Sequence, residues 1–113
     1  MTQPTVVTVK DILLDAAGLI ETHGWIRHEY GTPAKGFCAM GALYSACDVR
    51  FHDSFKVTLA RNALRKAAGL TNTHSIVNWN DYKAESKEQV IETFRKAAEI
   101  CEEANPHDRA EIN

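Results

Sequence analysis

Hydrophobic positions recur at helical spacing in several segments of this chain. Between Val9 and Ile20 the apolar residues repeat every three or four positions, with charged residues between them, which predicts an amphipathic helix. Thr8 is a suitable N-cap for this helix, with Asp11 at its third position, and Gly24 is a typical terminator. We therefore predict that the first element of the chain is a helix whose apolar face packs against the rest of the protein.

The segment from Gly36 to Cys47 differs from the rest, because it contains no charged side chain. A helix that is apolar or small around its whole circumference has to be enclosed by other elements. We therefore predict a helix from about Phe37 to Cys47 as the buried centre of a small bundle.

Two further helices are predicted in the second half of the chain. One begins at Asp53 or Ser54 and stops at Gly69, and the other begins at a Ser86 capping box and stops before Pro106. The first of these two has an apolar stripe of Phe55, Leu59, Ala63 and Ala67, widened by Val57, Ala60 and Leu64. We predict a connecting loop over residues 27–35, and a long irregular loop over residues 70–84 with an extended or single-turn segment around Trp79.

Helices joined by loops, without an alternating strand pattern, indicate an all-α fold. We predict a compact four-helix domain with a buried central helix and one long irregular loop. Residues 1–7 would be an N-terminal extension, residues 8–105 the single helical domain, and residues 106–113 a polar tail.

Composition narrows the classes of function. The 113 residues carry a formal net charge of −2, which argues against a general polyanion binder and against a polybasic membrane association. No apolar run is long enough to cross a bilayer, and no signal-peptide pattern is visible. Three cysteines without a short spacing are typical of reduced thiols, so we expect a cytoplasmic protein.

Several short motifs resemble a domain family. They are Gly24-Trp25, the run Phe37-Cys38-Ala39-Met40-Gly41-Ala42-Leu43, and Trp79-Asn80-Asp81 followed by Ser86-Lys87-Glu88-Gln89-Val90. Their order resembles a family of unknown function that comprises small proteins of actinobacteria and of the phages that infect them. The resemblance covers residues 9–101 and implies a small intracellular helical protein of a kind that phages also encode. It brings no catalytic residues with it.

The cysteines and histidines offer two kinds of site. A metal site is disfavoured because Cys38 and Cys47 would lie on opposite sides of one helix and no short Cys or His pair exists, so we expect no cofactor. A small Cys/His enzyme would use Cys38, in the first turn of the central helix, with His23, His28 or His52. Apolar neighbours oppose this alternative, because they disfavour a thiolate. A non-enzymatic role is therefore the expectation.

Nucleic-acid binding is a second alternative. From Arg50 to Leu70 the charge is strongly positive, and Arg61, Arg65 and Lys66 could contact successive phosphates. Basic residues on the outer face of an amphipathic helix are commonly only solvated, however, and the last helix is acidic.

Protein binding is the remaining function, and we expect a host protein or a second copy of the chain as the partner. Trp, Tyr and Arg are over-represented at binding hot spots. The predicted partner-binding residues are Trp25, Arg27, Tyr30, Trp79 and Tyr82. An alternative for the Trp79-Asn80-Asp81 motif is structural: the tryptophan covers the end of the bundle and the polar side chains bond to loop backbone.

Overall fold

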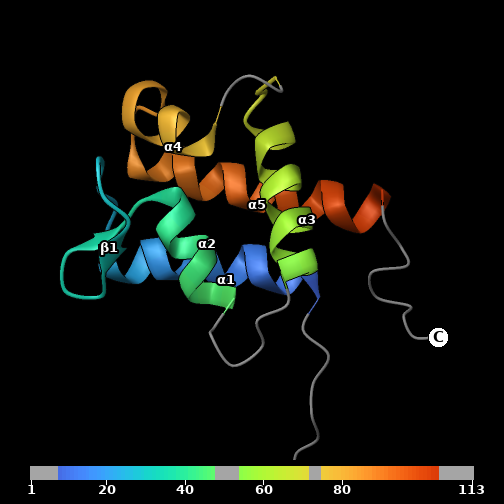
Figure 1. The fold of residues 1–113 in the computed structure, drawn as a ribbon, viewed down its shortest axis with the longest axis horizontal. Coiled ribbons are helices and arrows are strands. Elements are labelled where there is room, and N and C mark those ends of the chain that lie inside the picture. Colours follow the sequence, from blue (N-terminus) through green and yellow to red (C-terminus); the bar gives the residue numbers. More distant parts are fainter. Residues whose placement is uncertain (1–7, 48–53, 72–74, 105–113) are drawn as a thin grey trace, which may run out of the picture.

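The computed structural model describes residues 8–47, 54–71 and 75–104. Within them the chain forms five α-helices, one π-helical turn and one two-stranded sheet (Figure 1). In chain order the elements are α1 (Val9–His23), β1 (Gly31–Thr32), β2 (Gly36–Phe37), α2 (Ala39–Cys47), α3 (Ser54–Ala67), α4 (Ile76–Asn78), η1 (Trp79–Lys83) and α5 (Lys87–Ala104). The predicted extension 1–7, the tail 106–113 and the predicted helix ends at Asp53 and Asn105–Pro106 lie outside the described residues.

Helix α1 begins and ends as its sequence predicts. The Thr8 hydroxyl accepts the Asp11 N–H at 3.0 Å, and the Asp11 carboxylate accepts the Thr8 N–H at 3.2 Å, which completes a capping box. At the other end Gly24 has a φ of 107°, and its N–H bonds to the carbonyl of Ile20 at 2.8 Å. These local signals confirm the predicted helix.

Helix α5 also begins at its predicted cap, although the capping pattern differs in one bond. The Ser86 hydroxyl accepts the Gln89 N–H at 3.0 Å. The side chain of Gln89 accepts the Glu85 N–H at 2.6 Å, one residue before the bond that a complete capping box would make.

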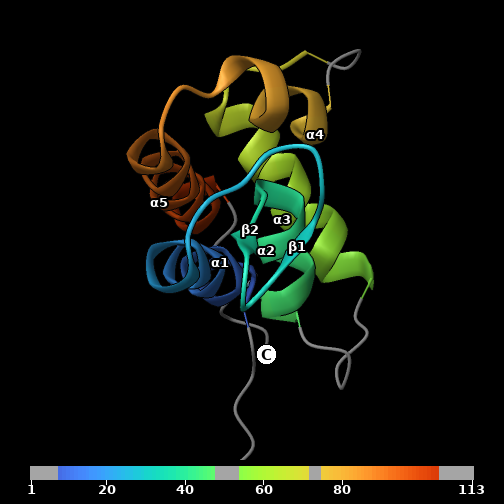
Figure 2. The same ribbon diagram turned by 90° about the vertical axis from the view of Figure 1, so that its left-hand side faces the viewer.

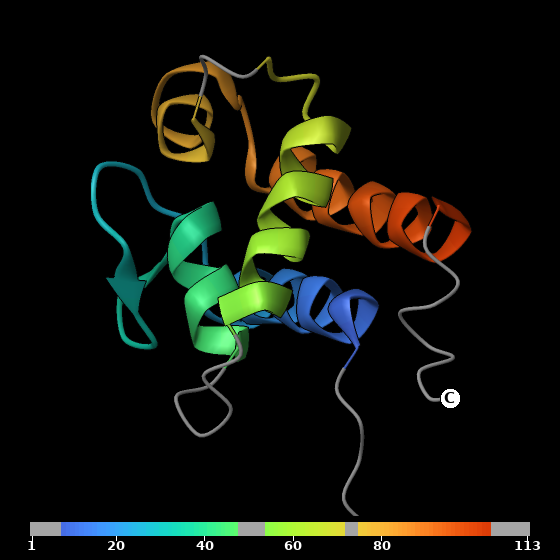
Figure 3. The same ribbon diagram turned by 45° about the vertical axis from the view of Figure 1, so that its right-hand side comes forward.

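The long helices form the framework of the domain. Helices α1 and α5 lie side by side and run in opposite directions, and α3 crosses both of them (Figures 1 and 3). Helix α2 and the hairpin cover one end of α1, and the α4–η1 segment lies above them (Figure 2). The largest fully buried side chains come from all four long elements: Leu13, Ile20, Leu43, Leu64 and Phe94.

Helix α2 is buried over only part of its length. Residues 39–43 are buried, but Tyr44 is 47% exposed and Ser45 is also exposed. The prediction of a helix enclosed on every side was therefore wrong for its second half. Phe37 belongs to β2 and lies outside the helix. Gly41 packs so tightly that a Cβ there would collide with the carbonyl oxygen of Tyr30.

Helix α3 buries its apolar stripe only in part. Ala60 and Leu64 are fully buried, and Leu59 packs against the core. Phe55, predicted as part of the stripe, is 69% exposed. It lies in the first turn of α3, where the helix has not yet reached the core.

The fold class is mostly helical and requires two corrections to the four-helix prediction. First, residues 27–35 are more than a loop, because β1 and β2 pair in an antiparallel hairpin, with Gly31 opposite Phe37. Gly36 has a φ of 103° and lies against the Gly24 backbone, so a side chain at this position would collide with it. Second, the predicted irregular loop contains α4, which begins at a Ser75 cap, and the π-helical turn η1.

Candidate functional site

The side chain of Asn80 is the polar centre of this end of the molecule. It is fully buried and is the only buried polar or charged residue in the described part of the chain. Its Oδ1 accepts the indole N–H of Trp25 at 2.7 Å and the backbone N–H of Ala39 at 3.0 Å. Its Nδ2 donates to the carbonyl of Ile26 at 3.1 Å and to the carboxylate of Asp81 at 3.0 Å. All of its hydrogen-bonding capacity is thereby used inside the protein.

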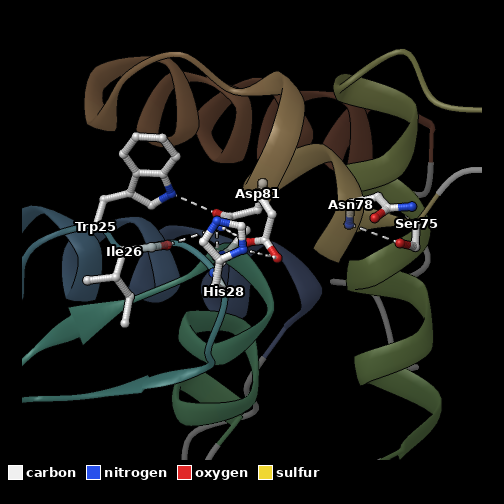
Figure 4. Close-up of polar contacts among 8 residues, drawn as sticks. Trp25, Ile26, His28, Ser75, Asn78 and Asp81 are labelled. Atoms are coloured by element: carbon white, nitrogen blue, oxygen red, sulfur yellow. Dashed lines mark hydrogen bonds and ion pairs between the residues drawn. The ribbon is translucent and has the colours of Figure 1, made fainter.

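Asp81 and Arg27 fasten the loop after α1 to the same turn. The Asp81 carboxylate accepts the backbone N–H of His28 at 2.8 Å, and its other oxygen lies 3.6 Å from His28 Nδ1 (Figure 4). Arg27 donates to the carbonyl of Ala84 at 2.8 Å, and its guanidinium stacks on the ring of Trp25 at 4.6 Å. His28 has a φ of 73°, which is uncommon for a residue other than glycine. The bond to Asp81 holds this conformation.

The π-helical turn explains why these groups converge. It places Trp79 and Asn80 in the interior in succession, while the next residue, Asp81, faces the loop. Single π-turns are rare and often occur at functional sites. The motif therefore ties the loop, the start of α2 and η1 into one unit, as the structural alternative for it expected.

A cleft of about 200 Å³ opens beside this unit. It is lined by His28, Glu29, Tyr30, Cys38, Val77 and Asp81. Cys38 precedes α2, its carbonyl accepts the first helical bond from Ala42, and it is itself buried. Its sulfur accepts the N–H of Gly41 at 3.3 Å, which is the bond that a capping side chain makes.

The Cys/His enzyme alternative gains no support from this geometry. Burial is the main cause that raises the pKa of Cys38 above its usual value of 9.0, and the charge of Asp81 adds to it, while hydrogen bonds from backbone N–H groups act in the opposite direction. The thiol is therefore protonated near neutral pH, whereas a nucleophilic cysteine needs a thiolate. Among the described residues no hydrogen bond joins this thiol to a histidine. His52 lies outside the described residues.

Exposed aromatic side chains surround the cleft. Tyr30 packs edge-to-face on Tyr44, with ring centroids 5.8 Å apart, and His28 packs on Tyr82 at 5.5 Å. Tyr30, His28 and Val77 all line the cleft itself. We call these five residues, His28, Tyr30, Tyr44, Val77 and Tyr82, the aromatic face. Two ring contacts and the shared cleft link its members from α2 across the loop to η1.

The residues predicted to bind a partner fall into two groups. Tyr30 and Tyr82 are 56% and 70% exposed, and Arg27 is exposed with its guanidinium held by Ala84 and Trp25. Trp25 is half-buried and hydrogen-bonded to Asn80, and Trp79 is buried. Tyr44 and Val77 were not among the partner-binding residues predicted from the sequence. The pair Tyr44-Ser45, the first polar positions in an otherwise apolar helix, was the available signal for an exposed edge.

The residues of the nucleic-acid alternative, Arg61, Arg65 and Lys66, all lie in α3. The guanidinium of Arg65 bonds to the carbonyl of Thr71, close to the end of α3. Arg61 is half-buried and Lys66 is exposed. Arg50, which contributed to the positive charge of this region, lies outside the described residues.

The described residues were also compared with the patterns of a metal site and of a membrane-spanning helix. In residues 8–47, 54–71 and 75–104, no three His, Cys, Asp or Glu side chains come together as metal ligands would. None of the helices in this part of the chain has both the length and the apolar character needed to cross a bilayer.

Comparison with known families gives one match, to the model of a family of unknown function named DUF6197, over residues 4–100. The chain belongs to DUF6197. The match includes α1, the hairpin, α2, α3, the Trp79-Asn80-Asp81 motif and most of α5. Searches of curated proteins and of solved structures found no significant match. Membership in DUF6197 therefore carries no assigned activity, and the function has to be argued from the site.

Proposed function

We propose that this DUF6197 protein is a non-enzymatic module that binds another protein through the aromatic face. One observation carries the proposal. The described residues include six large exposed hydrophobic side chains, and Tyr30, Tyr44, Val77 and Tyr82 of these belong to the aromatic face. Single exposed apolar residues are ordinary on a protein surface, whereas a contiguous group around a cleft is typical of an interaction site.

The chemistry of the aromatic face suits protein recognition. Tyrosine presents a large rigid ring with a polar end, so it loses little conformational entropy when it becomes buried at an interface. The edge-to-face contacts with Tyr44 and His28 restrict the rings of Tyr30 and Tyr82 further. A surface that is ordered before binding loses less conformational entropy when the partner binds, which favours affinity.

The partner class follows from the resemblance to actinobacterial and actinophage proteins and from the lack of a strong net charge. A cytoplasmic host protein fits a phage-encoded module, and a second copy of the chain is the other partner that the aromatic face suits. Nucleic acid is the alternative partner, through Arg61, Arg65 and Lys66 of α3.

The test uses substitutions on and off the aromatic face. Tyr30→Ala and Tyr82→Ala remove exposed rings, and Leu14→Ala and Phe55→Ala remove exposed apolar side chains elsewhere. Each variant is coupled to beads and exposed to cell lysate, and recovered proteins are quantified by mass spectrometry. Sedimentation of the same variants reports self-association.

The expected result is a set of proteins, or a dimer, retained by the wild type and by the two control variants and lost with Tyr30→Ala and Tyr82→Ala. Equal recovery with all four variants, together with a monomeric wild type, would refute binding through this surface. A gel shift with DNA and RNA at low salt tests the nucleic-acid class, because phosphate contacts weaken steeply with salt.

A further inference from the structure

We propose that the cleft inside the aromatic face is a receptor for one cationic side chain, an arginine or a lysine of the protein partner. This inference rests on the proposed function and specifies the chemistry of the partner. It is carried by the carboxylates, the ring surface and the size of the cleft.

Asp81 is the central group. Its side chain is only 9% exposed, yet it is a carboxylate and it lines the cleft. One oxygen accepts two hydrogen bonds, from the His28 N–H and from the Asn80 amide. The other oxygen lies 3.6 Å from His28 Nδ1, a distance that permits an ion pair with a protonated imidazole but is too long for a hydrogen bond. A carboxylate has acceptor sites for about four hydrogen bonds, so this second oxygen retains capacity for a cationic donor.

Glu29 also lines the cleft and carries a second negative charge. It is paired with Lys35 at 3.0 Å, and both side chains are more than half exposed. Exposed ion pairs of this kind are weak, so Lys35 does not hold Glu29 strongly. A guest cation that contacts both Asp81 and Glu29 would replace a weak surface interaction with a more enclosed one.

The remaining walls suit the rest of such a side chain. Tyr30 offers a ring surface for a guanidinium or ammonium group. Val77 offers an apolar surface for the methylene stem. Pockets for drug-sized ligands measure about 300–1,000 Å³, so a cleft of about 200 Å³ is suited to one long side chain.

The test is a titration followed by NMR, with the full chain labelled with ¹⁵N. Three blocked tripeptides serve as probes, Gly-Arg-Gly, Gly-citrulline-Gly and Gly-Glu-Gly, of which citrulline is the uncharged analogue of arginine. We expect the arginine peptide to shift the amide resonances of His28, Tyr30 and Cys38, with an affinity at least tenfold higher than that of the citrulline peptide. Shifts that are equal for the arginine and citrulline peptides, or absent for both, would overturn the inference.

Variants locate the effect. Asp81→Asn keeps an oxygen that can accept the His28 and Asn80 bonds, so the fold should persist. It removes the charge and replaces the second oxygen by an NH2 group, which donates and does not accept. We therefore expect at least a fivefold loss of affinity for the arginine peptide. Glu88→Gln, which removes an exposed carboxylate from α5, is the matched control and should change nothing. An unchanged affinity in Asp81→Asn contradicts the inference. If that variant does not fold, the comparison of wild-type titrations decides.

The outcomes separate the two proposals. Loss of partner recovery in Tyr30→Ala and Tyr82→Ala without selective arginine binding leaves the proposed function standing and rejects the cation receptor. Selective arginine binding with equal recovery in all surface variants rejects the aromatic face as the protein-binding surface.

Discussion

Replacement of Asn80 is the sharpest test of how this domain is held together. Asn80→Ala removes all four hydrogen bonds of the side chain. The backbone N–H of Ala39 is then buried without a partner, because Ala39 is fully buried at the start of α2. Trp25 and Ile26 are only half-buried, so water can reach their polar groups more easily.

The magnitude follows from these contacts. An unsatisfied buried donor costs about 1–3 kcal/mol, and each lost hydrogen bond contributes about 0.5–1.5 kcal/mol. We therefore expect Asn80→Ala to lower the free energy of unfolding by about 3–5 kcal/mol, a large share of the ~5–15 kcal/mol typical of a domain. Urea denaturation measures this change in the free energy of unfolding, provided that the dependence of that free energy on urea concentration has the same slope in variant and wild type. The exposed amide of Asn78 is the control, and Asn78→Ala should change stability by less than about 0.5 kcal/mol.

Asn80→Asp tests whether the side chain at position 80 must donate hydrogen bonds as well as accept them. The new carboxylate can still accept from Trp25 and Ala39, but it cannot donate to Ile26, and it places a second negative charge next to Asp81. Burial and this neighbour raise the pKa of the introduced carboxyl above its unfolded value of about 3.9. The variant should therefore be strongly destabilised at pH 7 and should recover as the pH falls toward that unfolded value. Two results would show that the four bonds do not hold this end of the fold. One is a free energy of unfolding for Asn80→Ala that lies within about 1 kcal/mol of the wild-type value. The other is an Asn80→Asp variant whose stability does not increase as the pH falls.

Three further predictions concern single contacts. Gly41→Ala should destabilise by about 1–3 kcal/mol, because its Cβ meets the Tyr30 carbonyl, whereas Gly18→Ala, with nothing near its Cβ, should stabilise α1 by about 0.5–1 kcal/mol; equal melting temperatures would contradict the tight contact. Ser86→Ala should cost about 1 kcal/mol through the lost cap, and an unchanged urea midpoint would show that the bond is not made in solution. Because burial raises the pKa of Cys38 above 9.0, the stability that its thiol contributes is complete below about pH 9 and is lost as the pH rises further. Between about pH 8 and pH 11, the free energy of unfolding should therefore fall less steeply with pH in Cys38→Ala than in wild type. Parallel curves of the free energy of unfolding against pH would contradict the raised pKa.

The elements that the sequence predicted well are those specified by nearby residues. The cap at Thr8, the stop at Gly24 and the cap at Ser86 depend on bonds that span three or four residues, so the pattern contains their whole cause. The hairpin was missed because each strand has two residues, too few for an alternating pattern. The exposure of Phe55 was missed because periodicity gives the direction of a side chain on its helix, and the neighbouring elements decide whether anything covers it.

The candidate site was predictable only in its ingredients. The sequence drew attention to Tyr30, Tyr82 and Asn80, but the bonds of Asn80 reach residues 41 and 55 positions away. No local pattern encodes such distances. The same limit applies to the cleft, whose walls come from the loop after α1, the start of α2, α4 and η1.

The buried amide and the aromatic face are mechanically connected, and this connection separates a structural role for Asn80 from a binding role. Asn80 touches no solvent, so it cannot contact a partner directly. It fixes the loop that carries Tyr30 and the turn that carries Tyr82 relative to each other, through Ile26 on one side and its own backbone on the other. At a temperature at which Asn80→Ala is still folded, any loss of partner binding must come from a less ordered aromatic face. Binding that matches wild type in that folded variant would show that the partner orders the surface itself.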